Sequence, residues 1–365
     1  MQRPSFTQPP LALPMLIAIV GLACAGKSAV AEYLELRHGF MRLTLNGDGP
    51  TDFSSANDML HYATANWRTN FVTLDVDTSA LVDLFEKRPF FLLLGVEAPL
   101  LQRWRRAQVR AAASQHTPMS LEAFVARDDA VLYGSNATDG WLASDVSNLS
   151  LLTQTGALVS ASFPAAQTSL AALLQRCQLR IANTFASVDA LHKHLDSLAL
   201  PSMHRVRPTW DTYFVQLCTL ASLRSNCMKR RVGAVLVRNH RVLATGYNGT
   251  PRGLSNCNEG GCARCNESAT CGSNLDECLC LHAEENALLE LGRDRGGAEG
   301  TILYCNTYVL LVHTNSSCPC LRCAVKIVQT GVREVVYQLE YSMDGRSAQI
   351  FGDAGVAFRK YLPPF

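Results

Sequence analysis

The distribution of cysteine constrains this chain more than any other feature of its sequence. Twelve of its 14 cysteines lie at or after Cys218, and only Cys24 and Cys177 precede that point. Secreted domains held together by disulfides are usually short, with cysteines spread along the chain. The uneven distribution therefore predicts a metal-binding C-terminal half and a reducing compartment, the cytoplasm.

Length and composition exclude several other classes of protein. At 365 residues the chain suits two domains, each able to bury a sizeable core. A hydrophobic content of 48%, a charged content of 18% and a net charge of +2 exclude a disordered chain and a strongly polyanion-binding one. No stretch reaches the ~18 unbroken apolar residues of a membrane span. We therefore expect neither a membrane nor a nucleic acid among the partners.

Short apolar runs alternate with helical patterns along the chain, which predicts an α/β fold with a parallel sheet in the N-terminal domain. Strands are expected at residues 15–20, 89–96, 232–237, 242–245, 301–305 and 334–337. Helices are expected at residues 27–37, around 103–110, after Thr209, at 282–291 and near Pro319. The helix after Thr209 is expected to bury an apolar face of Trp210, Tyr213, Phe214, Leu217, Leu220 and Ala221. Residues 205–208 are the expected linker.

The C-terminal half contains a set of residues typical of a catalytic zinc site. His282 precedes Glu284 by two positions, and Cys320 and Cys323 follow Pro319 at a helix start. Catalytic zinc uses three protein ligands and keeps a fourth position open, which His282, Cys320 and Cys323 can provide. The positive end of the helix dipole also favours thiolates there.

Glu284 is expected to move protons beside this metal without binding it, as general acid and base. His-x-Glu followed by Pro-Cys-x-x-Cys is the known signature of zinc nucleobase deaminases, in which activated water attacks the ring carbon carrying the amino group. Taken singly, Cys-x-x-Cys is often a structural or redox motif, and His-x-Glu is usually part of a helix surface. Their combination in this order favours catalysis.

From Arg207 to Tyr361 the sequence resembles the deoxycytidylate (dCMP) deaminases, especially those of fungi. The segments that carry the resemblance are Arg231-Val-Gly-Ala-Val235, Gly246-Tyr-Asn-Gly-Thr-Pro-Arg-Gly253, Cys280-Leu-His-Ala-Glu-Glu-Asn-Ala287, Pro319 to Cys323, Gly331-Val-Arg-Glu-Val-Val-Tyr337 and Ala354-Gly-Val356. The resemblance implies a zinc-dependent deaminase domain at 207–361 with a three-layer α/β/α cytidine-deaminase-like fold. It also implies a hydrolase that converts dCMP to dUMP and ammonia, feeding thymidylate synthesis.

The resemblance further implies substrate contacts and regulation. Asn248 matches a position that approaches the nucleotide, and Arg293 and Tyr341 match positions that bind its phosphate. Alternatively, Asn248 belongs to a plain hairpin turn and Arg293 is a solvated surface residue. Family members are commonly homohexamers, activated by dCTP and inhibited by dTTP, with residues 246–253 as the place to look for an effector site.

Further cysteines gather in a Gly- and Asn-rich segment that cannot bury a core of its own. A metal clip would order such a segment. In related deaminases, cysteines matching Cys227 and Cys257 hold a second, structural zinc, so the resemblance implies one structural ion here. Its remaining ligands come from Cys262, Cys265, Cys278 or Cys280, and the sequence leaves open which. The alternatives are free thiols and a DNA-binding zinc module.

The N-terminal domain, residues 15–200, contains a complete phosphate-binding loop, Gly21-Leu-Ala-Cys-Ala-Gly-Lys-Ser28, between a strand and a helix. Gly21 and Gly26 allow backbone N–H groups to surround phosphates, while Lys27 reaches the β/γ oxygens and Ser28 binds Mg²⁺, so ATP and Mg²⁺ are expected ligands. This loop, residues 21–28, explains the apolar run at 11–25 better than a signal peptide does. The domain resembles nucleotide kinases, with Arg103, Arg105, Arg106 and Arg110 where a lid would lie. Only Glu97 follows a buried strand, so the phosphate acceptor is not evident.

Residues 308–317 depart from the dCMP deaminase pattern, because they separate the strand near Thr307 from the zinc-binding cysteines. They form either a loop or lid, or an artefact of the gene model or splicing. We therefore predict a P-loop domain followed by a zinc dCMP deaminase. A tRNA or polynucleotide deaminase, and a non-catalytic zinc-stabilised nucleotide-binding module, are the alternatives.

Overall fold

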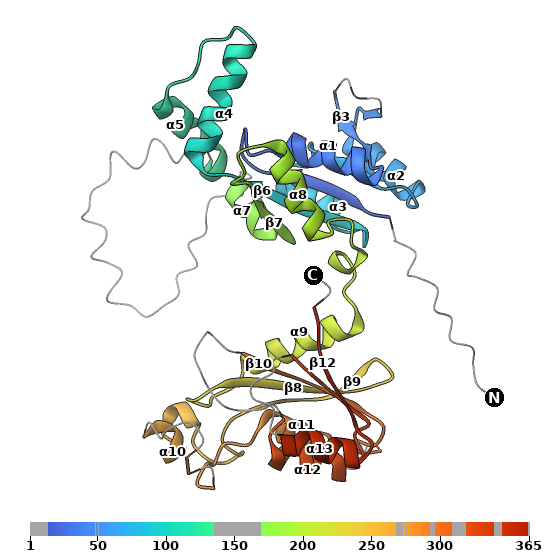
Figure 1. The fold of residues 1–365 in the computed structure, drawn as a ribbon, viewed down its shortest axis with the longest axis vertical. Coiled ribbons are helices and arrows are strands. Elements are labelled where there is room, and N and C mark those ends of the chain that lie inside the picture. The colour runs from blue at the N-terminus through green and yellow to red at the C-terminus, as the bar shows by residue number, and fades with distance from the viewer. Residues whose placement is uncertain are drawn as a thin grey trace, which may run out of the picture. The chain divides into compact units, whose positions relative to one another are not determined.

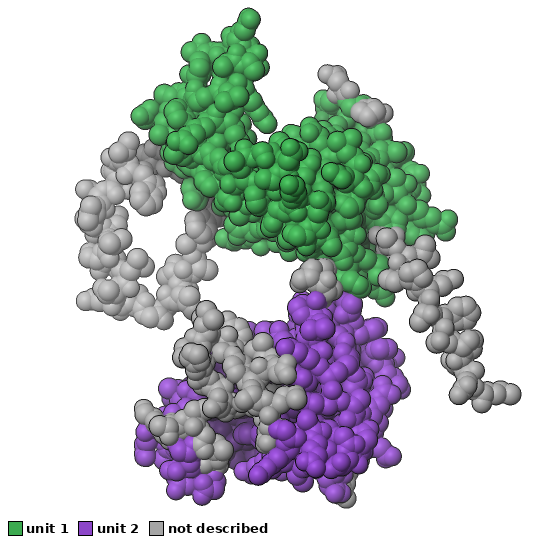
Figure 2. Space-filling model, viewed as in Figure 1, with its two compact units in different colours: residues 1–207, 365 green, residues 208–364 purple. Residues whose placement is uncertain are grey.

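The computed structural model describes residues 14–47, 49, 51–134, 169–267, 273–274, 276–292, 296–308, 319–338 and 345–363. The chain divides into two compact units, residues 1–207 with residue 365, and residues 208–364 (Figures 1 and 2). The boundary lies within the expected linker. None of the described helices is long and apolar enough to cross a membrane.

The first unit is built on a parallel sheet of five strands in the order β2-β5-β1-β6-β7. These strands are β1 (Leu16–Val20), β2 (Met41–Arg42), β5 (Phe71–Thr73), β6 (Phe91–Glu97) and β7 (Leu179–Ala182). Two strands of two residues each, β3 (Thr44–Leu45) and β4 (Asp52–Phe53), pair with each other outside this sheet. The parallel α/β class expected from the sequence is confirmed.

Helices cover both faces of this sheet (Figure 1). Their bounds are α1 (Lys27–His38), α2 (Ala56–Ala65), α3 (Ser79–Phe85), α4 (Leu100–Ala113), α5 (Leu121–Tyr133), α7 (Leu170–Arg176) and α8 (Val188–Leu198). All five side chains of β1 are buried because alternate residues face the two cores. Ile17 and Ile19 pack with α1 and α8, whereas Leu16 and Ala18 pack with α2, α3 and α7.

The second unit contains a mixed sheet in the order β12-β11-β10-β8-β9. Its strands are β8 (Arg231–Arg238), β9 (Arg241–Tyr247), β10 (Ile302–Tyr308), β11 (Glu334–Tyr337) and β12 (Ala357–Lys360). β10, β11 and β12 run parallel, while β8 pairs antiparallel with both β9 and β10. The expected hairpin forms through Asn239 and His240, whose positive φ values suit a two-residue turn.

Helices lie on both faces of the second sheet as well (Figure 1). α9 (Trp210–Ser222) packs on one face, and α11 (Ala283–Leu291), α12 (Leu321–Gln329) and α13 (Gly345–Asp353) pack on the other. The short η2 (Met203–Arg205), η3 (Cys257–Glu259) and α10 (Ala263–Asn266) complete the described helices. The described residues thus confirm a three-layer α/β/α arrangement.

The apolar face expected for α9 is wrong in part. Thr209 caps the helix as predicted, but Trp210 and Leu220 are 50% and 62% exposed. The buried positions include Cys218 and Ser222, because α9 lies very close to β8: a Cβ on Gly233 would stand 2.0 Å from the Cys218 carbonyl oxygen. Helical spacing identified apolar positions, but this close approach selects small side chains for the contact instead.

Candidate active site

Two helices of the second unit begin at the same place. His282 is the N-cap of α11, and Cys320 is the N-cap of α12, with Cys323 in its first turn. α11 is held against the sheet at Gly246, where an added Cβ would stand 2.1 Å from the Ala283 carbonyl oxygen. The positive ends of two helix dipoles therefore meet around these side chains, which favours negatively charged ligands such as thiolates.

The three predicted zinc ligands converge in the fold. Their ligand atoms lie within 4.8 Å of one another, and His282 Nδ1 is 3.3 Å from the sulfurs of both Cys320 and Cys323. One imidazole nitrogen and two sulfurs are donors that zinc accepts, and three ligands leave its fourth position open. The residues present thus fit a catalytic zinc ion, with ligation by Nδ1 of His282.

Proton sharing dominates the electrostatics of this group. The hydrogen bond of Cys320 with Cys323 lowers the pKa of Cys320 to about 4, and the one with His282 adds to this effect, against the effect of burial. The hydrogen bond with Cys320 raises the pKa of His282 to about 9, also against burial. The same Cys320 hydrogen bond and burial raise the pKa of Cys323. A metal ion would replace these shared protons, because zinc ligands must be deprotonated.

Glu284 lies next to these residues without joining them. It is in the first turn of α11 and only 3% exposed. Its charge contributes to raising the pKa values of both His282 and Cys323, which shows that the carboxylate is near them. A buried carboxylate beside an open metal position can act as a general acid and base.

Asn248 follows β9 in a loop that is tied to the candidate site. Its Oδ1 accepts hydrogen bonds from the Val232 N–H and the Ser225 hydroxyl, each at 2.8 Å, and its Nδ2 donates to the Arg230 carbonyl at 2.9 Å. Gly249 pairs with Leu281, the residue before His282. The side chain thus orders the loop through the backbone around β8, while contact with a nucleotide stays a prediction.

Three predicted features lie outside the described residues. They are the phosphate-binding candidates Arg293 and Tyr341, and nearly all of the excursion, whose residues 309–317 follow the end of β10.

Six cysteines form a second, separate cluster in the C-terminal unit. They are Cys227, Cys257, Cys262, Cys265, Cys278 and Cys280. The sulfurs form two groups of four, and within each group all four lie within 4.8 Å of one another. Four sulfurs at such distances suit tetrahedral zinc. Each of the six cysteines named from the sequence therefore belongs to a group of four that could bind a metal ion.

The loop after β1 in the first unit has the shape expected of a phosphate site. An added Cβ would stand 2.1 Å from the Val96 carbonyl oxygen at Gly21, and 2.3 Å from the Asn183 amide nitrogen at Gly26, so only glycine fits. Lys27 begins α1 and donates to the Gly21 carbonyl, and Ser28 is exposed. Backbone N–H groups at such a helix start bind phosphates.

The expectation that only Glu97 follows a buried strand is wrong. Asp75 and Asp77 follow β5, which pairs directly with β1, and the charge of Asp77 acts on Lys27. Burial raises the pKa of Asp77 and lowers that of Lys27. Glu97 instead pairs with Arg180 on β7 at 2.7 Å. A strand of three residues is too short to be recognised from its sequence pattern, although the Asp-x-Asp that follows it can be read in the sequence.

Two arginines of α4, Arg103 and Arg106, are held by contacts within the first unit. Arg103 is buried and pairs with Asp128 on α5. Arg106 donates to the carbonyl of Cys24 at 3.2 Å and to that of Phe185 at 2.9 Å, which fixes the loop between β1 and α1. These contacts give Arg106 a structural role at the loop, whereas Arg103 connects α4 to α5.

Comparison with known proteins places this geometry in a family. The cytidine and deoxycytidylate deaminase zinc-binding region matches residues 208–339. The chain is 42% identical over 359 residues to the deoxycytidylate deaminase of Schizosaccharomyces pombe, covering 95% of this chain and 98% of that one. It is 40% identical over 347 residues to that of Saccharomyces cerevisiae, covering 95% and 96%. A solved dCMP deaminase of cyanophage S-TIM5, in complex with dCMP and dUMP, is 29% identical, covers 42% of this chain and 98% of that one, and has a TM-score of 0.32. The chain belongs to the deoxycytidylate deaminase family of enzymes.

Proposed function

We propose that this enzyme hydrolyses dCMP to dUMP and ammonia at the meeting point of α11 and α12, with zinc on His282, Cys320 and Cys323. The convergence of these three ligand atoms beside the buried Glu284 is the observation that carries the proposal. When bound, zinc supplies a Lewis acid that lowers the pKa of a water molecule towards neutrality.

Glu284 carries out the proton transfers in this proposal. Its carboxylate takes a proton from the attacking water and delivers it to N3 of the cytosine ring. A second proton passes through the same carboxylate to the departing amino group, so water and dCMP become dUMP and ammonia. Burial keeps this carboxylate out of bulk water, which strengthens its interactions with the reacting atoms.

Ammonia release by the purified full chain tests the proposal. With dCMP, Glu284→Gln is expected to lower kcat by about 10²–10⁴-fold, because general acid–base catalysis contributes that much. Glu290→Gln, an exposed position on the same helix, is the matched control and is expected to keep wild-type activity. Deamination of oligonucleotides in preference to dCMP, or a Glu284→Gln variant as active as the wild type, would refute the proposal.

Regulation and location extend this proposal beyond the active site. The enzyme supplies dUMP for thymidylate synthesis as a cytoplasmic homohexamer that dCTP activates and dTTP inhibits. The Gly249–Leu281 pairing supports residues 246–253 as the effector loop, because it connects them to His282. None of the twelve cysteines that the structure describes forms a disulfide, which is compatible with a reducing compartment. Sedimentation of the full chain, and its kinetics with each nucleotide, test these points.

We propose as a second function that the first unit binds ATP with Mg²⁺. The glycine-restricted loop before Lys27 supports it, and so does Asp77, which lies on the neighbouring strand end where an acidic partner of the cation is needed. Lys27→Ala is expected to abolish binding of a fluorescent ATP analogue. Lys87→Ala, an exposed lysine of the same unit, is the control. Equal binding by both variants would exclude this site.

A further inference from the structure

The six-cysteine cluster consists of two overlapping sets of four. Cys227 and Cys257 complete one set, Cys262 and Cys278 complete the other, and Cys265 and Cys280 belong to both. We propose that this cluster holds two zinc ions bridged by the thiolates of Cys265 and Cys280, instead of the single structural ion that the resemblance implies.

Sulfur–sulfur distances fit two tetrahedra that share an edge. A Zn–S bond of about 2.3 Å places the sulfurs of a regular tetrahedron about 3.8 Å apart. The Cys265 sulfur lies 4.0 Å from that of Cys227, in the first set, and 3.8 Å from that of Cys278, in the second. It lies 4.0 Å from Cys280, so the two shared sulfurs are themselves one tetrahedral edge apart. Each pair therefore matches ligation of a common ion.

A single ion would leave two cysteines of the cluster without metal. An ion in the first set leaves Cys262, which is fully buried, and an ion in the second set leaves Cys257, which is also fully buried. A thiol is a weak hydrogen-bond donor and acceptor, so hydrogen bonds would do little to stabilise a buried cysteine that binds no metal. Two ions use all six sulfurs, and two bridging thiolates reduce the total number of ligands from eight to six.

The surroundings of the cluster suit a thiolate–metal centre. Six thiolates around two divalent ions leave the same net charge as four thiolates around one ion, and the cationic Arg264 lies close to Cys265 and Cys278. The backbone N–H of Met228 points to the Cys257 sulfur at 3.4 Å. Hydrogen bonds of this kind orient a metal-binding thiolate and stabilise its charge.

The cluster lies close in the chain to His282, so it can stabilise the proposed deaminase site. Cys280 is followed by Leu281, which pairs with Gly249, and then by His282. A bridging ligand two residues before the proposed catalytic ligand fixes the entry of the chain into α11. The two ions would therefore stabilise the segment that places His282, although they lie outside the catalytic group.

Zinc content of the purified full chain, measured by native mass spectrometry and elemental analysis, tests the proposal. Three zinc ions per chain are expected. Cys278→Ser and Cys227→Ser are each expected to lose one ion, and Cys265→Ser to lose two. Cys177→Ser, in the other unit, is the control and is expected to keep all three. If either Cys278→Ser or Cys227→Ser leaves the content unchanged, only one set of four binds metal and the proposal is overturned, as it is if iron or copper replaces zinc.

Two further measurements keep this result separate from the proposed catalysis and from failures of folding. The Cys323→Ala variant is expected to lose one ion. If it loses none while Cys265→Ser loses two, the bridged pair stands and the catalytic zinc does not. The wild-type chain loaded with ¹¹³Cd is expected to show two resonances from the cluster, coupled to each other through the shared sulfurs. Uncoupled cluster resonances, or a single one, would overturn the bridging without any variant.

Discussion

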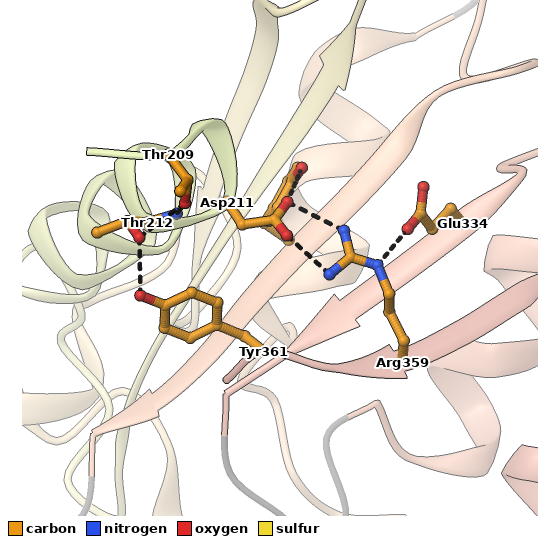
Figure 3. Close-up of polar contacts among 7 residues, drawn as sticks. Thr209, Asp211, Thr212, Glu334, Arg359 and Tyr361 are labelled. Carbon is orange, nitrogen blue, oxygen red and sulfur yellow. Dashed lines mark hydrogen bonds and ion pairs between the residues drawn. The ribbon is translucent and has the colours of Figure 1, made fainter. Parts of the chain in front are cut away.

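The two faces of the C-terminal sheet bury polar groups in opposite ways. On the α11 face, the Glu284 carboxylate and the Cys323 sulfur are buried, and the half-buried Cys320 sulfur and a His282 nitrogen lie next to that sulfur. On the α9 face, Asp211 accepts from Tyr304 and forms two hydrogen bonds with Arg359, which also pairs with Glu334 (Figure 3).

This difference suggests a division of roles: the polar groups on the α9 face stabilise the fold, and those on the α11 face are available for catalysis. On the α9 face each hydrogen-bond donor meets an acceptor, and Arg359 pairs with two carboxylates, so that network is complete without a ligand. The groups on the α11 face are mostly electron-pair donors, and such a set becomes stable and useful when a cation joins it. Matched substitutions on the two faces are therefore expected to differ in activity more than in stability.

The largest expected difference is between two buried cysteines, Cys323 on the α11 face and Cys218 on the α9 face. Cys323→Ala removes a proposed zinc ligand and is expected to lower kcat/KM for dCMP by at least about 10³-fold, equivalent to ~4 kcal/mol. Cys218→Ala removes a hydrogen bond to the Tyr304 carbonyl and some packing. It is expected to lower the free energy of unfolding by about 1 kcal/mol and to leave kcat/KM unchanged.

Kinetics at a temperature where both variants are folded, together with denaturant unfolding, provide the comparison. If Cys218→Ala lost activity as severely as Cys323→Ala, the two faces would not differ in function and the proposed division would be wrong.

Two glycines give an intermediate test, because each permits a helix to approach the sheet closely. A Cβ on Gly246 would meet the Ala283 carbonyl of α11, and one on Gly233 would meet the Cys218 carbonyl of α9, at 2.1 and 2.0 Å. Either alanine is expected to lower the free energy of unfolding by about 1–3 kcal/mol through overpacking. Only Gly246→Ala is expected to lower the activity of the folded fraction as well, because α11 carries His282 and Glu284.

Gly352→Ala is the control for this pair, since an added Cβ there meets nothing within 4 Å and the residue lies in α13. Activity per folded molecule, corrected by the unfolding curve, is the quantity to compare. Equal losses in Gly246→Ala and Gly233→Ala would show that both helices position the site.

Local sequence was enough to name candidate zinc ligands that converge in the fold, because the chemistry of such a site is tied to the spacing of its residues. His282 and Glu284 are two residues apart on one helix start, and Cys320 and Cys323 three apart at another, so each pair is positioned by its own helix. Strands with long apolar runs were equally clear, and β11 has the bounds predicted for it. These features depend on neighbours within a few residues.

Features that depend on packing between distant segments were missed. β5 has three residues, so its place beside β1, and with it Asp77 beside Lys27, becomes visible only in the folded sheet. The buried face of α9 is chosen by Gly233 on another element. In the same way, the overlap of the two cysteine sets depends on Cys227, which lies 38 residues from Cys265 in the chain but 4.0 Å from it in space.

The smallest expected effect is the pH dependence of the α9 face. Burial raises the pKa of Asp211, but its hydrogen bonds with Arg359 and Tyr304 outweigh this and lower the pKa overall. A carboxyl group with a lowered pKa in the folded state stabilises the protein above its unfolded pKa of about 4 and loses this contribution as pH falls through the folded value. Because Arg359 is partly exposed, Asp211→Asn is expected to cost only about 1–2 kcal/mol at pH 7.

Urea unfolding of the wild type and Asp211→Asn across pH 3–7 measures this contribution. The difference in unfolding free energy is expected to be constant from pH 7 to about 5 and to shrink below about pH 4, as Asp211 takes up a proton. Activity at pH 7 is expected to be unchanged. A difference independent of pH would mean that Asp211 acts through packing alone, and a loss of activity would mean that the α9 face contributes to catalysis after all.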